Sequence, residues 1–409
     1  RWGYFPSVSV GWRLSQENFL KNVEWLSELK LRGGWGQTGN QAGISDYGYL
    51  QRFSITRQNW WEAGKGDAMV TLRPNSFSNP NLTWETTTQS NIGLDLSLFK
   101  NRISLAVDAY LKKTTDLLMD VPLPATSPVP SIYRNEGEMT NKGLEFSVDS
   151  RNLTGNFEWN TNFNISFNRN ELTKLTLQKV YYYASTSEAI TEQVVRITEG
   201  QPLGKFWGFI SEGVDPQTGD IKYKDLNGDG KIDEKDRTVL GTGIPKTIIG
   251  LNNSFTYKGF DFSFFFEASL GAKMLNLTRI YLEDNNRLSD SADRWTKAHA
   301  SNSVPRNGYQ KTAKLQYGSY VNSRFVEDAD FVKLRNVELG YTFTGSQWNM
   351  KTLKTMRVFV GGQNLLTFTK YQGFNPDIST NGSSAIAQGL DLNSYPAYRT
   401  INFGVKLTF

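Results

Sequence analysis

Strict alternation of apolar and polar residues is the feature that most limits how this chain can fold. In 157–168 every odd position is apolar except Thr161, and every even position is polar. The same period of two recurs in 103–109, 260–270 and 401–409. Alternation sends successive side chains to opposite faces of a β-sheet, whereas a helix needs a period near 3.6. The sequence therefore predicts an all-β chain.

Eleven segments carry this strand pattern, and several run to about ten residues. They are 6–14, 29–37, 90–98, 102–111, 143–150, 156–169, 247–257, 260–270, 331–343, 356–363 and 400–409. Strands of soluble sheets usually have about 5–6 residues. A tilted strand needs about 9–11 residues to cross a bilayer. The lengths therefore favour membrane-spanning strands.

The connections between these segments alternate between short and long. The short ones include 99–101, 152–155 and 258–259, whose Asn and Gly residues suit tight turns, and 344–355 falls on the same side. The long polar segments are 38–89, 112–142, 170–246, 271–330 and 364–399. Outer-membrane barrels have short periplasmic turns and long extracellular loops. The alternative, a soluble sandwich or propeller, gives no reason for this asymmetry.

The two predicted faces also differ as a membrane barrel requires. One face carries bulky Phe, Leu, Ile and Val, and the other carries Asn, Ser, Thr and charged residues. A polar lumen explains a mean hydropathy of only −0.47. Phe409, on the apolar face of the last segment, fits the terminal pattern of bacterial outer-membrane barrels. No apolar run approaches the ~20 residues of a membrane helix.

The strand count predicts only part of a barrel. Single-chain bacterial barrels have an even number of strands, and an unpaired strand edge in lipid is very costly. Eleven strands therefore indicate the C-terminal half of a barrel of about 22 strands, the size of plugged transporters. The chain also opens at Arg1 with no initiator Met and no signal peptide, so we expect the remainder upstream.

Composition argues against several other classes of protein. The 409 residues include no Cys, which excludes disulfides, thiolate metal sites and Cys nucleophiles, and His299 is the single histidine. Lys and Arg number 45 against 40 Asp and Glu, with no basic stripe for nucleic acid. Acidic pairs such as Asp328/Asp330 and Glu283/Asp284 have no fixed separation. The sequence thus predicts no enzyme and no nucleic-acid partner.

Several segments together resemble one transporter family. They are 5–13, 29–40, 84–95, 113–118, 294–296 with 305–306, 326–328 and 331–341. In this combination the chain resembles the SusC/RagA-type TonB-dependent outer-membrane transporters of Bacteroidota, over nearly its whole length.

The resemblance implies a role and several partners. The chain would be the distal part of the barrel, with the plug, the TonB box and an amino-terminal extension upstream of Arg1. Such transporters import glycan fragments or peptides with a SusD-like surface lipoprotein that closes over the barrel as a lid. The TonB–ExbB–ExbD system supplies the energy. Outer-membrane lipid would surround the barrel of a Gram-negative cell.

The sharpest local motif is DLNGDGKIDEKD at 225–236, within the long extracellular segment 170–246. It matches the twelve-residue calcium loop, with Gly230 at the sharp turn. The expected ligands are the side chains of Asp225, Asn227, Asp229, Asp233 and Asp236 and the backbone carbonyl of Lys231. Asp236 replaces the Glu of an EF-hand, so we expect weak Ca²⁺ affinity and a loop-ordering role. The alternative is a metal-free, turn-rich loop; the resemblance favours the metal, since the family often carries such a stretch here.

Aromatic residues of the long segments are the candidate substrate contacts, because sugars stack on aromatic faces and peptides pack against them. They are Trp60, Trp61, Tyr181, Tyr182, Tyr183, Phe206, Trp207 and Tyr309. The alternative is that they pack the loops together or lie in the interfacial belt. The better candidates for belt or wall residues are Trp12, Trp35, Tyr110 and Tyr257. The pattern at 289–299 predicts a short helix that ends at a surface His299.

The leading functional hypothesis is energised import of a bulky nutrient, an oligosaccharide before a peptide. Two alternatives from other classes stay open at this point. One is a calcium-binding β-sandwich adhesin of the cell surface, which would be extracted without detergent. The other is a passive porin, which would need no plug upstream.

Overall fold

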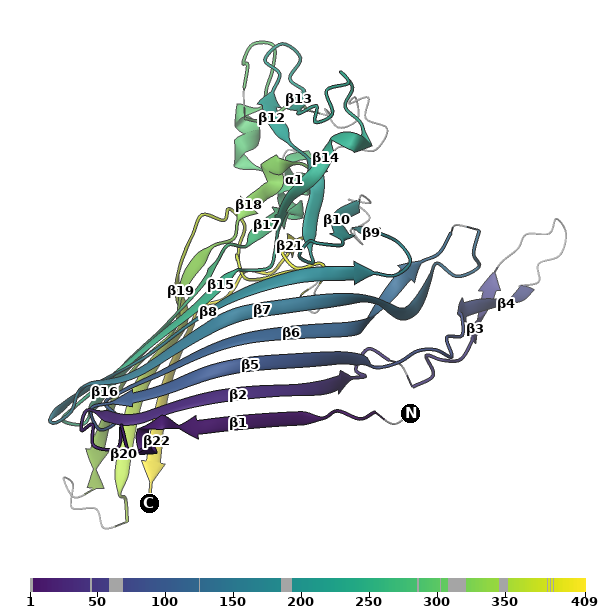
Figure 1. Ribbon diagram of the computed structural model, residues 1–409. Helices are drawn as coiled ribbons and strands as arrows, with labels where there is room; N and C mark the ends of the chain where they lie inside the picture. The colour runs from purple at the N-terminus through teal and green to yellow at the C-terminus, as the bar shows by residue number, and fades with distance from the viewer. Residues whose placement is uncertain are drawn as a thin grey trace.

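The computed structural model is an open, curved wall of β-strands with folded loops gathered at one end (Figure 1). The residues that the structure describes are 3–44, 46–58, 69–124, 126–184, 193–284, 287–301, 303–307, 321–345, 352–380, 382, 384 and 386–409. No helix among them is long and apolar enough to cross a membrane.

The wall is one sheet of eleven strands. In order across the sheet they are β1 (Ser7–Arg13), β2 (Leu26–Asn40), β5 (Glu85–Leu98), β6 (Ile103–Pro122), β7 (Ser131–Leu153), β8 (Phe157–Leu175), β15 (Thr247–Tyr257), β16 (Phe260–Leu270), β19 (Phe331–Thr344), β20 (Thr355–Thr369) and β22 (Thr400–Thr408). Every neighbouring pair is antiparallel. Each strand matches one predicted segment, so the predicted all-β, eleven-strand architecture is confirmed.

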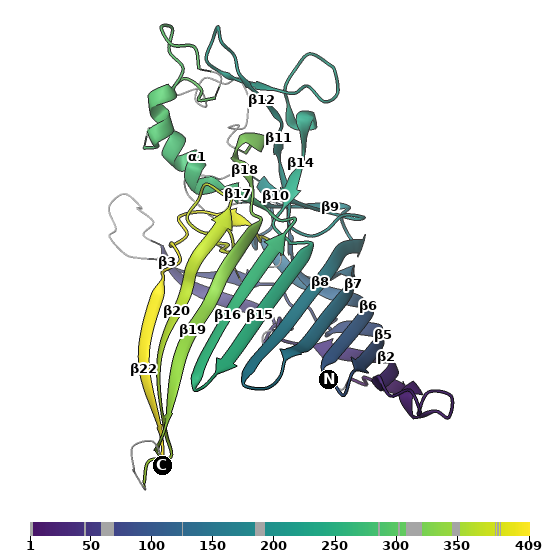
Figure 2. The ribbon, with the colours of Figure 1, turned by 90° about the vertical axis from the view of Figure 1, so that its left-hand side faces the viewer.

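Tight turns join the strands at the end away from the folded loops (Figure 2). Between β15 and β16 the turn is only Lys258 and Gly259, with φ angles of 45° and 90°. Positive φ at both central residues matches the right-handed twist of the flanking strands. At Gly259 a side chain would meet the carbonyl oxygen of Thr342 at 3.0 Å, so the turn needs glycine there.

The register keeps the two faces of the wall chemically distinct. On the apolar face Ile92 lies opposite Gly33 and Ala109, and it is 61% exposed. Leu144 and Phe167 are paired on the same face and are also exposed. No second layer of described residues covers these positions. The apolar rows therefore face outward to lipid rather than into a sandwich core.

The wall continues well beyond the predicted strands at the end that carries the folded loops. The sequence predicts a polar loop over 112–142, but β6 runs to Pro122 and β7 begins at Ser131. Asp116, with φ 57°, and register shifts near Leu117 interrupt the regular alternation there. Because alternation was the signal, this irregular stretch could not be read as strand.

Shorter elements make up the folded loops at this end of the wall, which we call the platform. They are β9 (Val180–Ala184), β10 (Gln193–Thr198), β11 (Lys205–Phe209), β14 (Arg237–Thr242), β12 (Ser211–Val214), β13 (Ile221–Tyr223), β17 (Lys273–Asn276), β18 (Val326–Asp328), β21 (Leu390–Asp391), and the helix α1 (Leu277–Asp284). A separate hairpin of β3 (Arg52–Gln58) and β4 (Met69–Ser76) projects from the rim (Figure 1). Segments expected as plain loops thus contain their own small sheets.

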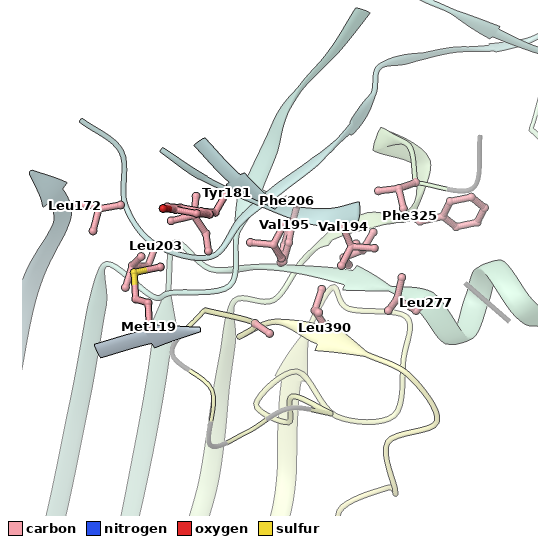
Figure 3. Packing of buried hydrophobic residues seen from close by; sticks show 14 of the residues in the cluster. Met119, Leu172, Tyr181, Val194, Val195, Leu203, Phe206, Leu277, Phe325 and Leu390 are labelled. Carbon is pink, nitrogen blue, oxygen red and sulfur yellow. The ribbon is translucent and has the colours of Figure 1, made fainter. Parts of the chain in front are cut away.

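The platform has a hydrophobic core to which the wall and three long loops contribute (Figure 3). Val121 and Leu172 come from the wall strands, and Phe206, Leu275 and Leu390 come from the loops. All five are at most 2% exposed. The loops are therefore packed onto the wall and onto one another.

The short helix predicted over 289–299 is mostly wrong. Only Ser289–Asp293 is helical, as a single 3₁₀ turn. Arg294 instead forms a strand-like bridge with Val304 and is 9% exposed. The burial of Arg294 takes precedence over the local helical pattern. His299 is exposed, as expected.

The lipid-facing assignment predicts a face-dependent response to charge. Ile92 lies six residues before Leu98, the last residue of β5, which is at the end with the tight turns. Six residues span about 20 Å along a strand, so on a tilted strand Ile92 lies near the bilayer midplane. Ile92→Lys in the intact protein should destabilise the assembled barrel by about 2–4 kcal/mol. Asn91→Lys, on the opposite face of the same strand, should be tolerated. Heat-modifiable migration of outer-membrane fractions measures both, and equal loss for the two variants would contradict the assignment.

Candidate functional site

The polar face of the wall is organised by ion pairs that reach across whole strands. Arg32 on β2 donates through Nε to Asp95 on β5 and through Nη2 to Asp108 on β6, both at 2.8 Å. Gly93 lies on the same rung between Arg32 and Asp108. A β-carbon at Gly93 would lie 2.4 Å from Asp108 Oδ1 and 2.8 Å from Arg32 Cζ. The missing side chain therefore makes room for the guanidinium.

The same arrangement recurs near the other edge of the wall. Arg357 on β20 lies over Gly340 of β19 and pairs with Asp261 of β16. Its Nη2 also donates to Glu338 at 2.6 Å. Bidentate and charge-assisted hydrogen bonds of this kind hold planar groups firmly. Arg357 thus ties three neighbouring strands together on the polar face.

A third contact of this type uses an uncharged pair. The Tyr110 hydroxyl on β6 donates to Asn168 Oδ1 on β8 at 3.1 Å. Gly143 of β7 is on the rung between them. Tyr110 is therefore a wall residue of the polar face, consistent with its interpretation as belt or wall. Trp12 and Trp35 are exposed on the apolar face, as is Tyr257 near the turns.

One long loop of the platform end folds down onto the polar face. Lys333 is 2% exposed, and its Nζ donates to Asn375 Oδ1 at 2.5 Å and lies 2.8 Å from Asp377 Oδ2. Arg335 joins Asp377 to Glu267. Burial alone would raise the pKa of Asp377, but the ammonium of Lys333 and the guanidinium of Arg335 outweigh it, so the pKa is lowered. Asp377 therefore anchors this loop as a carboxylate.

The structure separates the predicted aromatic contacts into buried and exposed residues. Tyr181 and Trp207 are 4% and 8% exposed, and Phe206 is fully buried. Burial and a hydrogen bond to Glu136 raise the pKa of Tyr181 to about 12. These three side chains hold the platform together and do not offer a surface to a solute.

Tyr182 is the exposed member of the group. It is 40% exposed, and its ring centroid lies 6.2 Å from that of Trp207. Tyr183 is partly buried against the core. Trp60, Trp61 and Tyr309 lie outside the described residues.

The loop at 225–236 forms a compact turn whose acidic side chains accept backbone hydrogen bonds. Asp225 accepts from the N–H groups of Gly228 and Gly230 at 2.7 and 2.8 Å. Asp233 and Asp236 form a reciprocal capping box. Burial would raise the pKa of Asp236, but hydrogen bonds from the backbone at Asp233, Leu226 and Asn227 outweigh it and lower the pKa. Gly230 has φ 77°, as the sharp turn requires.

No group of three or more His, Cys, Asp or Glu side chains in the described part of the chain is arranged to hold a metal ion. The acidic pairs noted in the sequence are also engaged elsewhere. Asp328 pairs with Lys273, Asp330 accepts from Gly271 N–H, and Glu283 pairs with Arg324. These three carboxylates are thus held in structural contacts, and the side chain of Asp284 lies outside the described part of the chain.

Sequence reasoning missed the residues that organise the polar face. Gly93, Gly143 and Gly340 look like ordinary strand glycines, and Arg32 and Arg357 look like ordinary lumen charges. The contacts could have been predicted only from two features together. These are a glycine on the polar face and a long polar side chain opposite it on the neighbouring strand. Reading it required the register, which the sequence does not state.

Comparison with known proteins identifies the fold and its family. A family model described as TonB dependent receptor-like, beta-barrel matches residues 1–365. The chain belongs to this TonB-dependent receptor family. TonB-dependent receptor P3 of Formosa agariphila is 36% identical over all of this chain and 42% of its own length. TonB-dependent receptor SusC of Bacteroides thetaiotaomicron is 34% identical over all of this chain and 40% of its own length.

A solved structure agrees with this placement. The structure of the RagAB peptide transporter superposes with a TM-score of 0.83 at 26% identity, over 99% of this chain and 43% of that one. The receptor chain thus spans about two fifths of the relatives that it matches. The SusC/RagA-type resemblance and the outer-membrane location in Gram-negative bacteria are confirmed, and the family consists of receptors and transporters rather than enzymes.

The glycine gap under Arg32 gives a sharp test of the polar face. Gly93→Ala in the full-length receptor should displace the guanidinium and weaken two charge-assisted hydrogen bonds. We expect a loss of about 1–3 kcal/mol, seen as a lower midpoint in thermal unfolding of the detergent-solubilised barrel. Gly33→Ala is the control, because its β-carbon would meet nothing nearer than Val10 at 3.7 Å. Equal midpoints for the two variants would contradict this role of Gly93.

Proposed function

We propose that this receptor chain forms part of an outer-membrane importer for a bulky polar nutrient, an oligosaccharide. The observation that carries the proposal is the wall itself, which is apolar on one face and polar on the other, with a packed platform at one end only. A polar face suits the lining of a water-filled channel, and the platform suits capture of a solute at the entrance of that channel.

The remainder of the importer is inferred from the edges of the wall. β1 and β22 are the two ends of the sheet, and open edges are not tolerated in lipid. We infer that further strands of the same receptor pair with them and that a plug fills the lumen. The similarity to SusC and to the RagAB complex supports a SusD-like surface lipoprotein as the lid and energy supplied through TonB–ExbB–ExbD.

The polar face favours an uncharged solute. Arg32, Arg335 and Arg357 already pair with carboxylates of the wall or its loop. Much of the remaining hydrogen-bonding capacity is neutral, from the row Asn160, Asn162, Asn164, Ser166 and Asn168 on β8. Amides suit the hydroxyl groups of sugars. Peptide import is the second candidate, because the RagAB neighbour is described as a peptide transporter.

Uptake by cells that make the full-length receptor and its lipoprotein partner tests this proposal. Fluorescent oligosaccharides should accumulate, a matched mixture of oligopeptides should not, and accumulation should stop when TonB is deleted. Accumulation of peptides alone would establish the second candidate. Uptake that persists without TonB would instead indicate a passive pore.

We also propose that Ca²⁺ orders the loop at 225–236. Oxygen-bearing side chains recur through this loop, and Gly230 adopts the turn that a calcium loop needs. Asp225, Asn227 and Asp229 now accept backbone N–H groups. Each carboxylate has further lone pairs, so these side chains fit a cation after a modest rotation. The ion would neutralise their mutual repulsion.

Limited proteolysis of the full-length receptor tests calcium binding. About 1 mM Ca²⁺ should slow cleavage within 215–245 relative to chelator, and Asp225→Asn with Asp229→Asn should abolish that protection. Asp215→Asn is the matched control, since Asp215 accepts backbone hydrogen bonds in a nearby turn outside the loop. A cleavage rate unaffected by Ca²⁺ would show that the loop is metal-free.

A further inference from the structure

The polar face beside the free edge of the wall carries a lysine that pairs with no carboxylate of the described residues. Lys30 of β2 lies directly opposite Arg13 of β1 and Asp95 of β5. Asp95 accepts a hydrogen bond from Arg32 at 2.8 Å, and Glu28 lies 3.8 Å from Arg13. The neighbouring carboxylates are thus engaged by other cations. Like charges directly opposite one another, such as Lys30 and Arg13, destabilise a sheet.

The side chain of Lys30 runs along the sheet toward β1. Its Cε lies 3.2 Å from the position that a β-carbon of Gly11 would take, so the missing side chain of Gly11 leaves room for it. The ammonium is one bond, about 1.5 Å, beyond Cε. Because β1 is the last strand at this end of the sheet (Figure 1), Lys30 extends over the final strand at the open edge.

Arg357 shows what such a side chain contacts where the wall continues. It is paired with Thr342 of β19, yet its guanidinium lies over Gly340, two residues nearer the platform. From there it donates to Asp261 of β16, which is directly opposite Gly340 on the next strand. A cation that leans over a glycine in this way therefore meets the residue opposite that glycine, one strand further on.

Lys30 repeats this geometry at β1. It is paired with Arg13 and leans over Gly11, again two residues nearer the platform. The residue that it would meet lies opposite Gly11 on the next strand, beyond the described wall. On the apolar face the flanking residues Val10 and Trp12 are 73% and 52% exposed. The strand that covers this edge thus needs an anion at one position and an apolar residue on either side of it.

We propose that the strand that pairs with β1 carries an aspartate or glutamate opposite Gly11, and that Lys30 binds this carboxylate across the junction of the two strands, which we call the seam. The proposal rests on the closure of the barrel by further strands of the same receptor, proposed above. A strand is favoured over the plug because the aliphatic part of Lys30 lies against Gly11, along the sheet. The ion pair also fixes the register of the seam, since a slip of one residue turns the carboxylate toward lipid.

Carbodiimide crosslinking of the full-length receptor in detergent tests the proposal, because this reagent joins an amine to a carboxylate only where the two are in contact. Mass spectrometry of the digested protein should show Lys30 joined to an Asp or Glu outside the 409 residues, with an apolar residue on each side of it. Lys113 and Glu138, whose charged atoms are 2.7 Å apart, are the positive control. Lys30→Gln should remove the first product and leave the second.

Exchange of the two charges tests whether the contact stabilises the seam. Lys30→Glu should lower the thermal midpoint of the detergent-solubilised barrel, because two carboxylates then meet over Gly11. Replacing the crosslinked carboxylate by lysine in the same protein should restore most of that loss. Lys354→Glu is the matched control for reversal of one charge, since Lys354 is exposed just before β20, and its midpoint should stay near that of the wild type.

Three results would overturn the proposal. Lys30 could be joined to Asp95, to Glu28 or to the plug, or it could give no product while the control pair reacts, or the exchanged charges could restore nothing. Barrel closure is tested separately with Ser9→Cys, on the polar face of β1 in a chain without cysteine. Cysteines placed along the upstream strand should form a disulfide with it wherever the strands pair, whatever Lys30 contacts. Absence of every such disulfide would overturn closure together with the seam.

Discussion

The lack of hydrogen-bonding partners in a lipid bilayer is the constraint on which this structure depends. Every backbone N–H and C=O in the hydrocarbon core must pair with a neighbouring strand, and the strands between β1 and β22 do so on both sides. Pairing fixes the register, and a shift of one residue would exchange the two faces. Each side chain is thereby assigned to lipid or to water. The apolar face and the polar face are two consequences of one set of backbone bonds.

Side chains of the polar face must span a long distance to join strands that are not neighbours. Neighbouring strands lie about 4.8 Å apart, so a side chain must span nearly 10 Å to contact the second strand along. Arg32, Tyr110 and Arg357 do this by lying over a glycine of the intervening strand. Each contact joins three strands without adding apolar surface. These contacts therefore stabilise the wall from the polar face, where charge is tolerated, and the opposite face stays largely apolar.

How much the sequence could predict follows from which contacts are local. Alternation is local, so the strands, their order and their faces were all predictable, including Phe167 toward lipid. The platform core is not, because Val121, Phe206 and Leu390 are far apart in the chain and meet only after folding. The run at 181–183 shows the limit well. Its three tyrosines stood out as candidate substrate contacts, but whether Tyr181 faced solvent or a core depended on loops whose positions no local pattern fixes.

The platform and the wall are mechanically one body, and this bears on how the mouth can change shape. β6 and β8 run past the membrane and contribute Val121 and Leu172 to the core that also holds Leu390. The loop of Leu390 is anchored below by Asp377 on Lys333 and Arg335. Moving that loop would expose core side chains and break a buried ion pair at once, a cost of several kcal/mol. For the importer proposed above, rearrangement of these loops would therefore require binding energy from a solute or a partner rather than thermal motion of free loops.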